Sequence, residues 1–376
     1  MATLKSIQAL RAVAATLVLL CHLFAIDQQT AKRTAPMTSF WENGAYGVDL
    51  FFVISGFVIV WVGAERRQAW KSAANFIAAR VVRIYPTWWL FAGLMAIALW
   101  LTSGVPWNVE RMAHWGMHGP SHLWHSFLLL PQSHHPVLGV GWTLVHEMYF
   151  YVVFAALICF VPIKRRPLAL WFWTALVLLG ALCGFADEFA KDWIALVFYP
   201  MTLEFCAGAF VAYLIKSGFM RYGRICFWLG SLGFVAVFFG ADQAIGALFG
   251  RDLQILHVWQ RTLTYGVCAA VLVYGAVARE LSAPREIPIP AALVRLGDWS
   301  YALYLCHPLV ISVTGRVGFH LMGFEGWLAP YVVLAVSLIA SVALSGIVYA
   351  TLERPLIARF KRWQASRRTP SQSAGG

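Results

Sequence analysis

The chain is poor in charged residues, which make up only 12% of its 376 positions, whereas hydrophobic residues make up 60%. A soluble domain carries roughly twice that share of charge. Apolar runs of about 20 residues recur from end to end, and this is the length that crosses a bilayer as a helix. Because a bilayer offers no water to backbone N–H and C=O groups, such runs fold as helices. The sequence therefore predicts an all-α polytopic membrane protein.

Cysteine is also scarce, with seven residues scattered singly and without a C-x-x-C pair. We interpret them as small apolar packing residues rather than as metal ligands or redox groups. The first apolar run lacks the small-residue cleavage site of a signal peptide and carries Arg11, so we expect it to be retained as a membrane helix.

The apolar runs predict about ten transmembrane helices that together form one integral membrane domain over residues 1–355. They are expected near residues 7–26, 44–63, 84–102, 142–162, 168–186, 193–215, 225–241, 257–278, 297–319 and 328–352. The polar segment 356–376 is expected to be a short, basic, disordered tail.

The net charge of +12 does not indicate a nucleic-acid partner, because the basic residues gather in alternate short loops. This distribution is typical of the cytoplasmic face of a membrane protein. The basic residues of these loops and of the tail are Arg66, Arg67, Lys71, Arg80, Arg83, Lys164, Arg165, Arg166, Lys216, Arg221, Arg224, Arg279, Arg285, Arg295, Arg359, Lys361, Arg362, Arg367 and Arg368. All of them lie on one side of the membrane if both termini are cytoplasmic, which is the predicted topology.

The first span contains two ionisable residues, Arg11 and His22. Their separation of eleven residues is close to three helical turns, so both side chains lie on one face, about 16 Å apart along the axis. Two interpretations are open. Arg11 can extend to the inner headgroups while His22 bonds a backbone carbonyl near the outer interface, or both can face a polar interior.

Further ionisable residues within or at the ends of apolar runs favour the second interpretation. These residues are Asp49, Glu147, Glu204, Arg261, Asp298, His307, Glu353 and Arg354. Isolated charges are costly in lipid, so several of these groups must face one another or a hydrated cavity. Such a cavity serves either catalysis or transport.

Several segments resemble, in order along nearly the whole chain, the motifs of the acyltransferase family 3 membrane proteins. Arg11 and His22 match the Arg-x10-His signature of the first helix in that family. The other matching segments are "GVDLFFVISGF" (47–57), "RVVRIYP" (80–86), "WTLVHEMYFY" (142–151), "SYALYLCHP" (300–308) and "YATLERP" (349–355). Thr143 stands where the family motif has serine.

The resemblance implies an O-acyltransferase of the bacterial inner membrane that moves an acyl group, usually acetyl, from acetyl-CoA to a carbohydrate hydroxyl. The acceptor is expected to be extracytoplasmic or lipid-linked, as in exopolysaccharide or O-antigen modification. The chain resembles the stand-alone exopolysaccharide type, because no esterase-like domain is appended to it.

Within this interpretation His22 is the predicted base for the acceptor hydroxyl, because an imidazole titrates near neutral pH. A covalent acyl-histidine relay is the open alternative. Arg11 joins His22 as a catalytic residue through the shared signature. Glu147 or Asp49 is expected to orient the imidazole, with Glu147 favoured by its motif. For Glu147 a helix–helix hydrogen bond is the structural alternative.

Arg80 and Arg83 are expected to bind the phosphates of the acyl-CoA donor, helped by Arg11 and Tyr85. Guanidinium groups match phosphate oxygens bidentately, and residues three apart lie on neighbouring faces of one helix. The alternative is simple anchoring of the cytoplasmic helix end by positive charge.

One histidine cluster raises the question of a metal site. His114, His118, His122 and His125 have helical spacing, but the Gly119–Pro120 pair interrupts the helix. We therefore predict no metal. Two other functions are kept open: a transporter or flippase for a lipid-linked glycan, and a non-catalytic partner of a polysaccharide-export complex.

Overall fold

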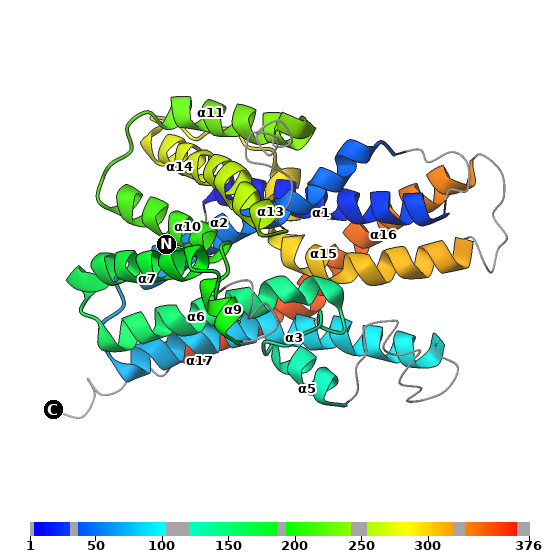
Figure 1. Cartoon of the computed structure of the whole chain (residues 1–376), viewed down its shortest axis with the longest axis horizontal. Helices are drawn as coiled ribbons and strands as arrows, with labels where there is room; N and C mark the ends of the chain where they lie inside the picture. The colour runs from blue at the N-terminus through cyan, green and yellow to red at the C-terminus, as the bar shows by residue number, and fades with distance from the viewer. Residues whose placement is uncertain are drawn as a thin grey trace.

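The computed structural model describes residues 4–30, 37–102, 120–185, 193–241, 254–318 and 328–366. Within these ranges the protein is helical and contains no strand. Figure 1 shows that most of the long helices run side by side along the longest axis of the molecule.

The helices of the first half are α1 (Lys5–Thr30), η1 (Ser39–Tyr46), α2 (Gly47–Gly63), α3 (Trp70–Thr102), α5 (Pro120–Leu128), η2 (Gly139–Gly141), α6 (Trp142–Phe160), η3 (Ile163–Arg165) and α7 (Arg166–Leu182). Those of the second half are α9 (Trp193–Phe198), α10 (Thr202–Lys216), α11 (Gly223–Ala236), η4 (Val237–Ala241), α13 (Gln254–Arg261), η5 (Thr262–Gly266), α14 (Val267–Ser282), α15 (Ala291–Arg316), α16 (Ala329–Val348), η7 (Tyr349–Glu353) and α17 (Arg354–Ser366).

In the described part of the chain, nine helices have the length and hydropathy of a membrane span. A tenth long helix, α15, spans 26 residues and packs against both α1 and α16. It includes Arg295, Asp298 and His307, whose polarity explains why it falls short by hydropathy alone. The prediction of an all-α, multi-pass membrane protein is confirmed.

Three elements differ from their predicted bounds. The predicted span 193–215 is divided at Pro200 into α9 and α10, because proline has no N–H for the helical ladder. Helix α3 begins at Trp70, well before the predicted start, so Arg80 and Arg83 are already helical. The segment 356–366, predicted to be disordered, forms most of α17, while 367–376 lies outside the described residues.

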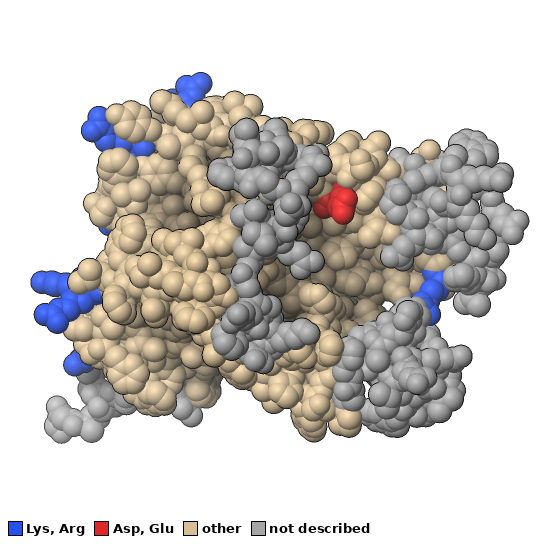
Figure 2. Space-filling view, in the orientation of Figure 1, with Lys and Arg blue, Asp and Glu red and all other residues tan. Residues whose placement is uncertain are grey.

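Most of the Lys and Arg side chains visible in Figure 2 lie at one end of the molecule, at its left. Figure 1 places the start of α1 at this same end, and the amide of Gln364 in α17 bonds to the carbonyl of Asn75 in α3 nearby. The sides of the bundle expose large apolar residues such as Phe172 and Ile339. The arrangement agrees with the expected topology, in which the basic end is cytoplasmic; that orientation remains a prediction.

Close helix crossings fix the centre of the bundle. A Cβ atom at Gly297 in α15 would lie 1.9 Å from the carbonyl oxygen of Gln8 in α1, and one at Gly56 in α2 would lie 1.9 Å from that of Phe205 in α10. Only glycine permits such approaches. The first crossing brings α1 and α15 into backbone contact, and both helices contribute residues to the site described below.

The basic end is held together by Arg166, which is fully buried. Its Nη1 donates to the carbonyls of Ala64 at 2.6 Å and Arg66 at 2.8 Å, its Nη2 to Ile158 at 3.1 Å and its Nε to Val161 at 3.2 Å. Ile158 and Val161 lie at the end of α6, and Ala64 and Arg66 follow directly on the end of α2, where backbone carbonyls lack partners within a helix. Arg166 therefore caps two helices at once.

Candidate active site

A cavity of about 440 Å³ lies inside the bundle, between α1, α2, α3, α6, α15 and the η7–α17 segment. Its polar lining consists of Gln8, Arg11, Ser55, Arg80, Arg83, Thr143, Glu147, Tyr151, Asp298, Ser300, Tyr301, Tyr304, Tyr349, Glu353 and Lys361. Leu4, Trp61 and Lys361 belong to the basic ends of α1, α2 and α17, so the cavity extends toward that end of the molecule. The structure therefore contains the polar interior that the sequence predicts.

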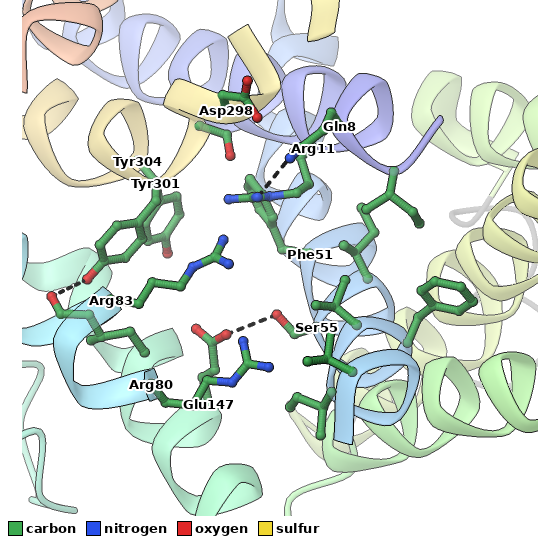
Figure 3. A pocket seen from close by; sticks show the side chains of 18 of the residues that line it. Gln8, Arg11, Phe51, Ser55, Arg80, Arg83, Glu147, Asp298, Tyr301 and Tyr304 are labelled. Atoms are coloured by element: carbon green, nitrogen blue, oxygen red, sulfur yellow. Dashed lines mark hydrogen bonds between the residues drawn. The ribbon is translucent and has the colours of Figure 1, made fainter. Parts of the chain in front are cut away.

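Three guanidinium groups dominate this cavity. Figure 3 shows Arg11 from α1 and Arg80 and Arg83 from α3 pointing into the same space. Within the described residues, no carboxylate forms an ion pair with any of the three. The hydrogen-bond partner of Arg11 in the described part of the chain is the amide oxygen of Gln8, at 3.2 Å. Guanidinium groups gathered without bound carboxylates in a buried site are suited to bind an anion.

Arg80 is held by aromatic rings rather than by acids. Its guanidinium carbon lies 5.3 Å from the ring centroids of both Phe76 and Tyr151, within the range of cation–π contacts. It is buried, and its Nε has no hydrogen-bond partner within the described ranges. The aromatic contacts fix its direction while leaving donor groups free.

Three carboxylates lie near the arginines without pairing with them. Glu147 in α6 accepts from the Ser55 hydroxyl at 3.1 Å and from the Tyr151 hydroxyl. Glu353, in the π-helical turn η7, accepts from Thr87 at 3.3 Å. Asp298 faces Arg11 across the α1–α15 crossing (Figure 3). These carboxylates offset part of the positive charge of the three arginines. An anionic ligand in the cavity would supply further negative charge.

His22 is not in the cavity lining. Its ring contacts His307 of α15, with ring centroids 4.7 Å apart and an interplanar angle of 70°. His307 in turn lies 6.0 Å from the ring of Tyr304, which does line the cavity and exchanges a 2.9 Å hydrogen bond with Thr143. The imidazole pair therefore lies one aromatic side chain beyond the arginine cavity.

The structure does not bring together all of the residues predicted for the site. The carboxylate of Asp49 accepts three hydrogen bonds from Arg261, at 2.7, 2.9 and 3.0 Å, and lies outside the cavity. Tyr85 donates to the carbonyl of Leu128 at 2.8 Å and also lies outside it. The expected contact between Glu147 and His22 is absent, because the His22 Nδ1 bonds the carbonyl of Val18 at 2.9 Å.

The structure adds residues that the predicted site did not include. Ser55, Tyr151, Tyr301 and Tyr304 line the cavity, and all of them lie within the segments 47–57, 142–151 and 300–308 quoted above. Glu353 lies in the last of the quoted segments. Their position inside the family motifs was the signal that could have indicated these residues. Hydropathy and spacing alone do not distinguish a tyrosine that lines a cavity from one that packs in the core.

The histidines considered as metal ligands fall partly on residues that the structure does not describe, namely His114 and His118. His122 and His125, which are described, bond the carbonyls of His135 and Ser121. Among the described residues, no group of three or more His, Cys, Asp or Glu side chains is arranged to hold a metal ion.

Comparison with known proteins identifies the family. The profile of a family described as an acyltransferase domain matches residues 4–350. The chain belongs to this acyltransferase family. It is a multi-pass membrane acyltransferase, and this decides between the enzyme and the two non-enzymatic interpretations.

Curated relatives cover most of the chain. The exopolysaccharide production protein ExoZ of Rhizobium meliloti (strain 1021) is 34% identical over 84% of this chain and 90% of its own length. The acyltransferase MdmB of Streptomyces mycarofaciens is 27% identical over 94% of this chain and 91% of its own. Nodulation protein 10 of Rhizobium leguminosarum bv. viciae is 23% identical over 83% and 82%. No solved structure matches significantly.

Proposed function

We propose that this enzyme transfers an acyl group, acetyl in the simplest case, from acyl-CoA to a hydroxyl of an extracytoplasmic or lipid-linked carbohydrate at the inner membrane. The similarity to a protein named for exopolysaccharide production supports a polysaccharide or its lipid-linked precursor as acceptor. The observation that carries the donor assignment is the group of three arginines without ion pairs in the cavity.

Coenzyme A brings several phosphate charges, and the predicted donor residues Arg80 and Arg83 face the cavity together with Arg11. Lys361 adds a fourth positive charge where the cavity approaches the basic end. An acyl-CoA that enters from this end would leave its phosphates against the arginines and direct its acyl group toward Phe51 and Tyr304. Tyr85 and Asp49 are not part of this proposed site, because other groups hold their side chains.

The chemical step is assigned to His22, either as base or as acyl carrier. As base, its Nε2 takes the proton of the acceptor hydroxyl, the oxygen attacks the thioester carbonyl, the C–S bond breaks, and the leaving thiolate recovers the proton. The Nδ1 bond to Val18 supports this role, because it fixes the tautomer that leaves the Nε2 lone pair available. Because Tyr304 lines the cavity on the side of His307, the proposal includes a movement of its ring that lets the thioester reach His22.

The test uses the purified protein in vesicles with labelled acetyl-CoA and a carbohydrate acceptor. Arg80→Gln and Arg83→Gln are each expected to raise the KM for acetyl-CoA by about 10- to 100-fold, the loss of one charge-assisted contact. Arg67→Gln is the matched control, since Arg67 lies exposed between α2 and α3. His22→Ala is expected to abolish transfer while donor binding persists. Equal KM values in all three arginine variants would contradict the donor site.

A further inference from the structure

His307 is a buried imidazole whose contacts mirror those of His22. It is 1% exposed, and its Nδ1 bonds the carbonyl of Leu303, four residues earlier in α15, at 3.0 Å. His22 makes the equivalent 2.9 Å bond to Val18, four residues earlier in α1. Because a carbonyl only accepts, both Nδ1 atoms carry the proton, and both Nε2 atoms hold a lone pair.

Among the residues that the structure describes, none forms a hydrogen bond with the Nε2 of His307. A buried polar atom without a partner costs stability, and an apolar side chain of similar size would avoid that cost. The unpaired Nε2 of His307 therefore indicates a function during the reaction that the structure does not show. Its neighbour is the imidazole of His22, at ring contact.

We propose that His22 and His307 divide the reaction between them, with His22 as acyl carrier and His307 as the base of the second step. This assignment rests on the proposed function and chooses the relay over direct transfer. It requires two imidazoles in contact, each with a free Nε2, and the structure provides this pair through the α1–α15 packing. A single imidazole that carries the acyl group has no free nitrogen with which to activate the acceptor.

In this relay the acyl group passes first to His22 and then to the acceptor hydroxyl. The Nε2 of His22 attacks the thioester carbonyl, the C–S bond breaks, and CoA leaves as the thiolate, so that His22 becomes an acyl-imidazolium. The acceptor hydroxyl then attacks the acyl carbon, its proton passes to the Nε2 of His307, and the C–N bond to His22 breaks. His307 finally returns the proton to the thiolate. Proton transfer to His307 is coupled to cleavage of the C–N bond, so the positive charge leaves the His22 ring as it appears on the His307 ring, and two adjacent imidazolium cations, which would repel each other, are avoided.

The experiment separates the two half-reactions in the full-length protein in vesicles. Without acceptor, exchange of label between CoA and acetyl-CoA reports the first step, and labelled product with acceptor reports both. The variants are His22→Gln, His307→Phe and His307→Gln. Cys306→Ala is the matched control. Cys306 is as buried in α15 as His307, but its thiol bonds the carbonyls of Leu303 and Ser341 and makes no ring contact with His22.

His307→Phe and His307→Gln are expected to keep the exchange within about threefold of the wild type and to lower transfer on the order of 100-fold, the loss of one general base. His22→Gln is expected to lose both activities, and Cys306→Ala neither. Loss of exchange and transfer in equal measure in the His307 variants would overturn the assignment. So would transfer unchanged by His307→Phe, or a wild type that transfers without any exchange. A wild type without transfer would overturn the proposed function itself.

Discussion

Asp49→Asn tests whether the buried carboxylate of α2 serves catalysis or the fold. Asp49 is fully buried and accepts three hydrogen bonds from Arg261, whose guanidinium also lies 5.0 Å from the ring centroid of Tyr46. Removing one member of a buried ion pair costs about 3–5 kcal/mol, because the other charge stays buried without compensation. The buried Glu204 also acts electrostatically on Arg261, and its carboxyl group can replace part of the lost interaction.

We therefore expect Asp49→Asn to cost about 3 kcal/mol, the lower part of that range, and Arg261→Gln about 5 kcal/mol, the upper part, because it leaves the fully buried Asp49 carboxylate without a cation. The double variant should cost less than the sum, since it leaves no uncompensated pair partner. Unfolding of membrane proteins is commonly irreversible, so the measurement compares apparent Tm values at one heating rate in one detergent. Glu42→Gln, which removes an exposed carboxylate of η1, is the control.

Activity must be expressed per folded molecule. If Asp49 is structural, the folded fraction of Asp49→Asn transfers acyl groups at a rate within about threefold of the wild type, because the carboxylate does not reach the cavity. A variant with wild-type Tm and no transfer would refute the structural assignment and return Asp49 to the catalytic set.

Two further predictions concern the framework of the site. Arg166→Met should cost about 2–4 kcal/mol through four lost charge-assisted bonds, partly replaced by water, and should lower the apparent Tm, whereas Arg165→Met, the exposed neighbour, should not. Equal Tm values for the two would contradict the capping role. Gly297→Ala should cost about 1–3 kcal/mol by overpacking against Gln8 and should lower transfer. The control, Gly93→Ala in α3, meets no atom within 4 Å and should be neutral or slightly stabilising.

Hydropathy was sufficient to predict the class of fold and most of the long helices. Each span must satisfy its own backbone hydrogen bonds in lipid, so it can be predicted from its own sequence without knowledge of the other spans. The same local reasoning placed Arg11 and His22 on one helix face. It did not predict the break at Pro200. It also did not predict the early start of α3, because the amphipathic stretch from Trp70 is less apolar than the span that follows.

Hydropathy and helical spacing could not predict contacts between residues of helices that are far apart in the sequence. Asp49 and Arg261 are 212 residues apart, and His22 and His307 are 285 apart, so no periodicity relates them. The packing of helices decides such pairs, through crossings like that of Gly297 on Gln8. Arg166 illustrates the same limit, because a basic residue in a cytoplasmic loop is expected to be exposed, and only the adjoining helix ends make it a buried cap.

The two polar centres of the enzyme depend on one helix pair. Helix α1 contributes Arg11 to the cavity and His22 to the imidazole pair, and α15 contributes Asp298 and Tyr304 to the cavity and His307 to the pair. Any shift of α15 along α1 changes both centres together. Tyr304, placed between them on α15, is therefore the side chain through which binding of a donor in the cavity can alter access to the imidazoles.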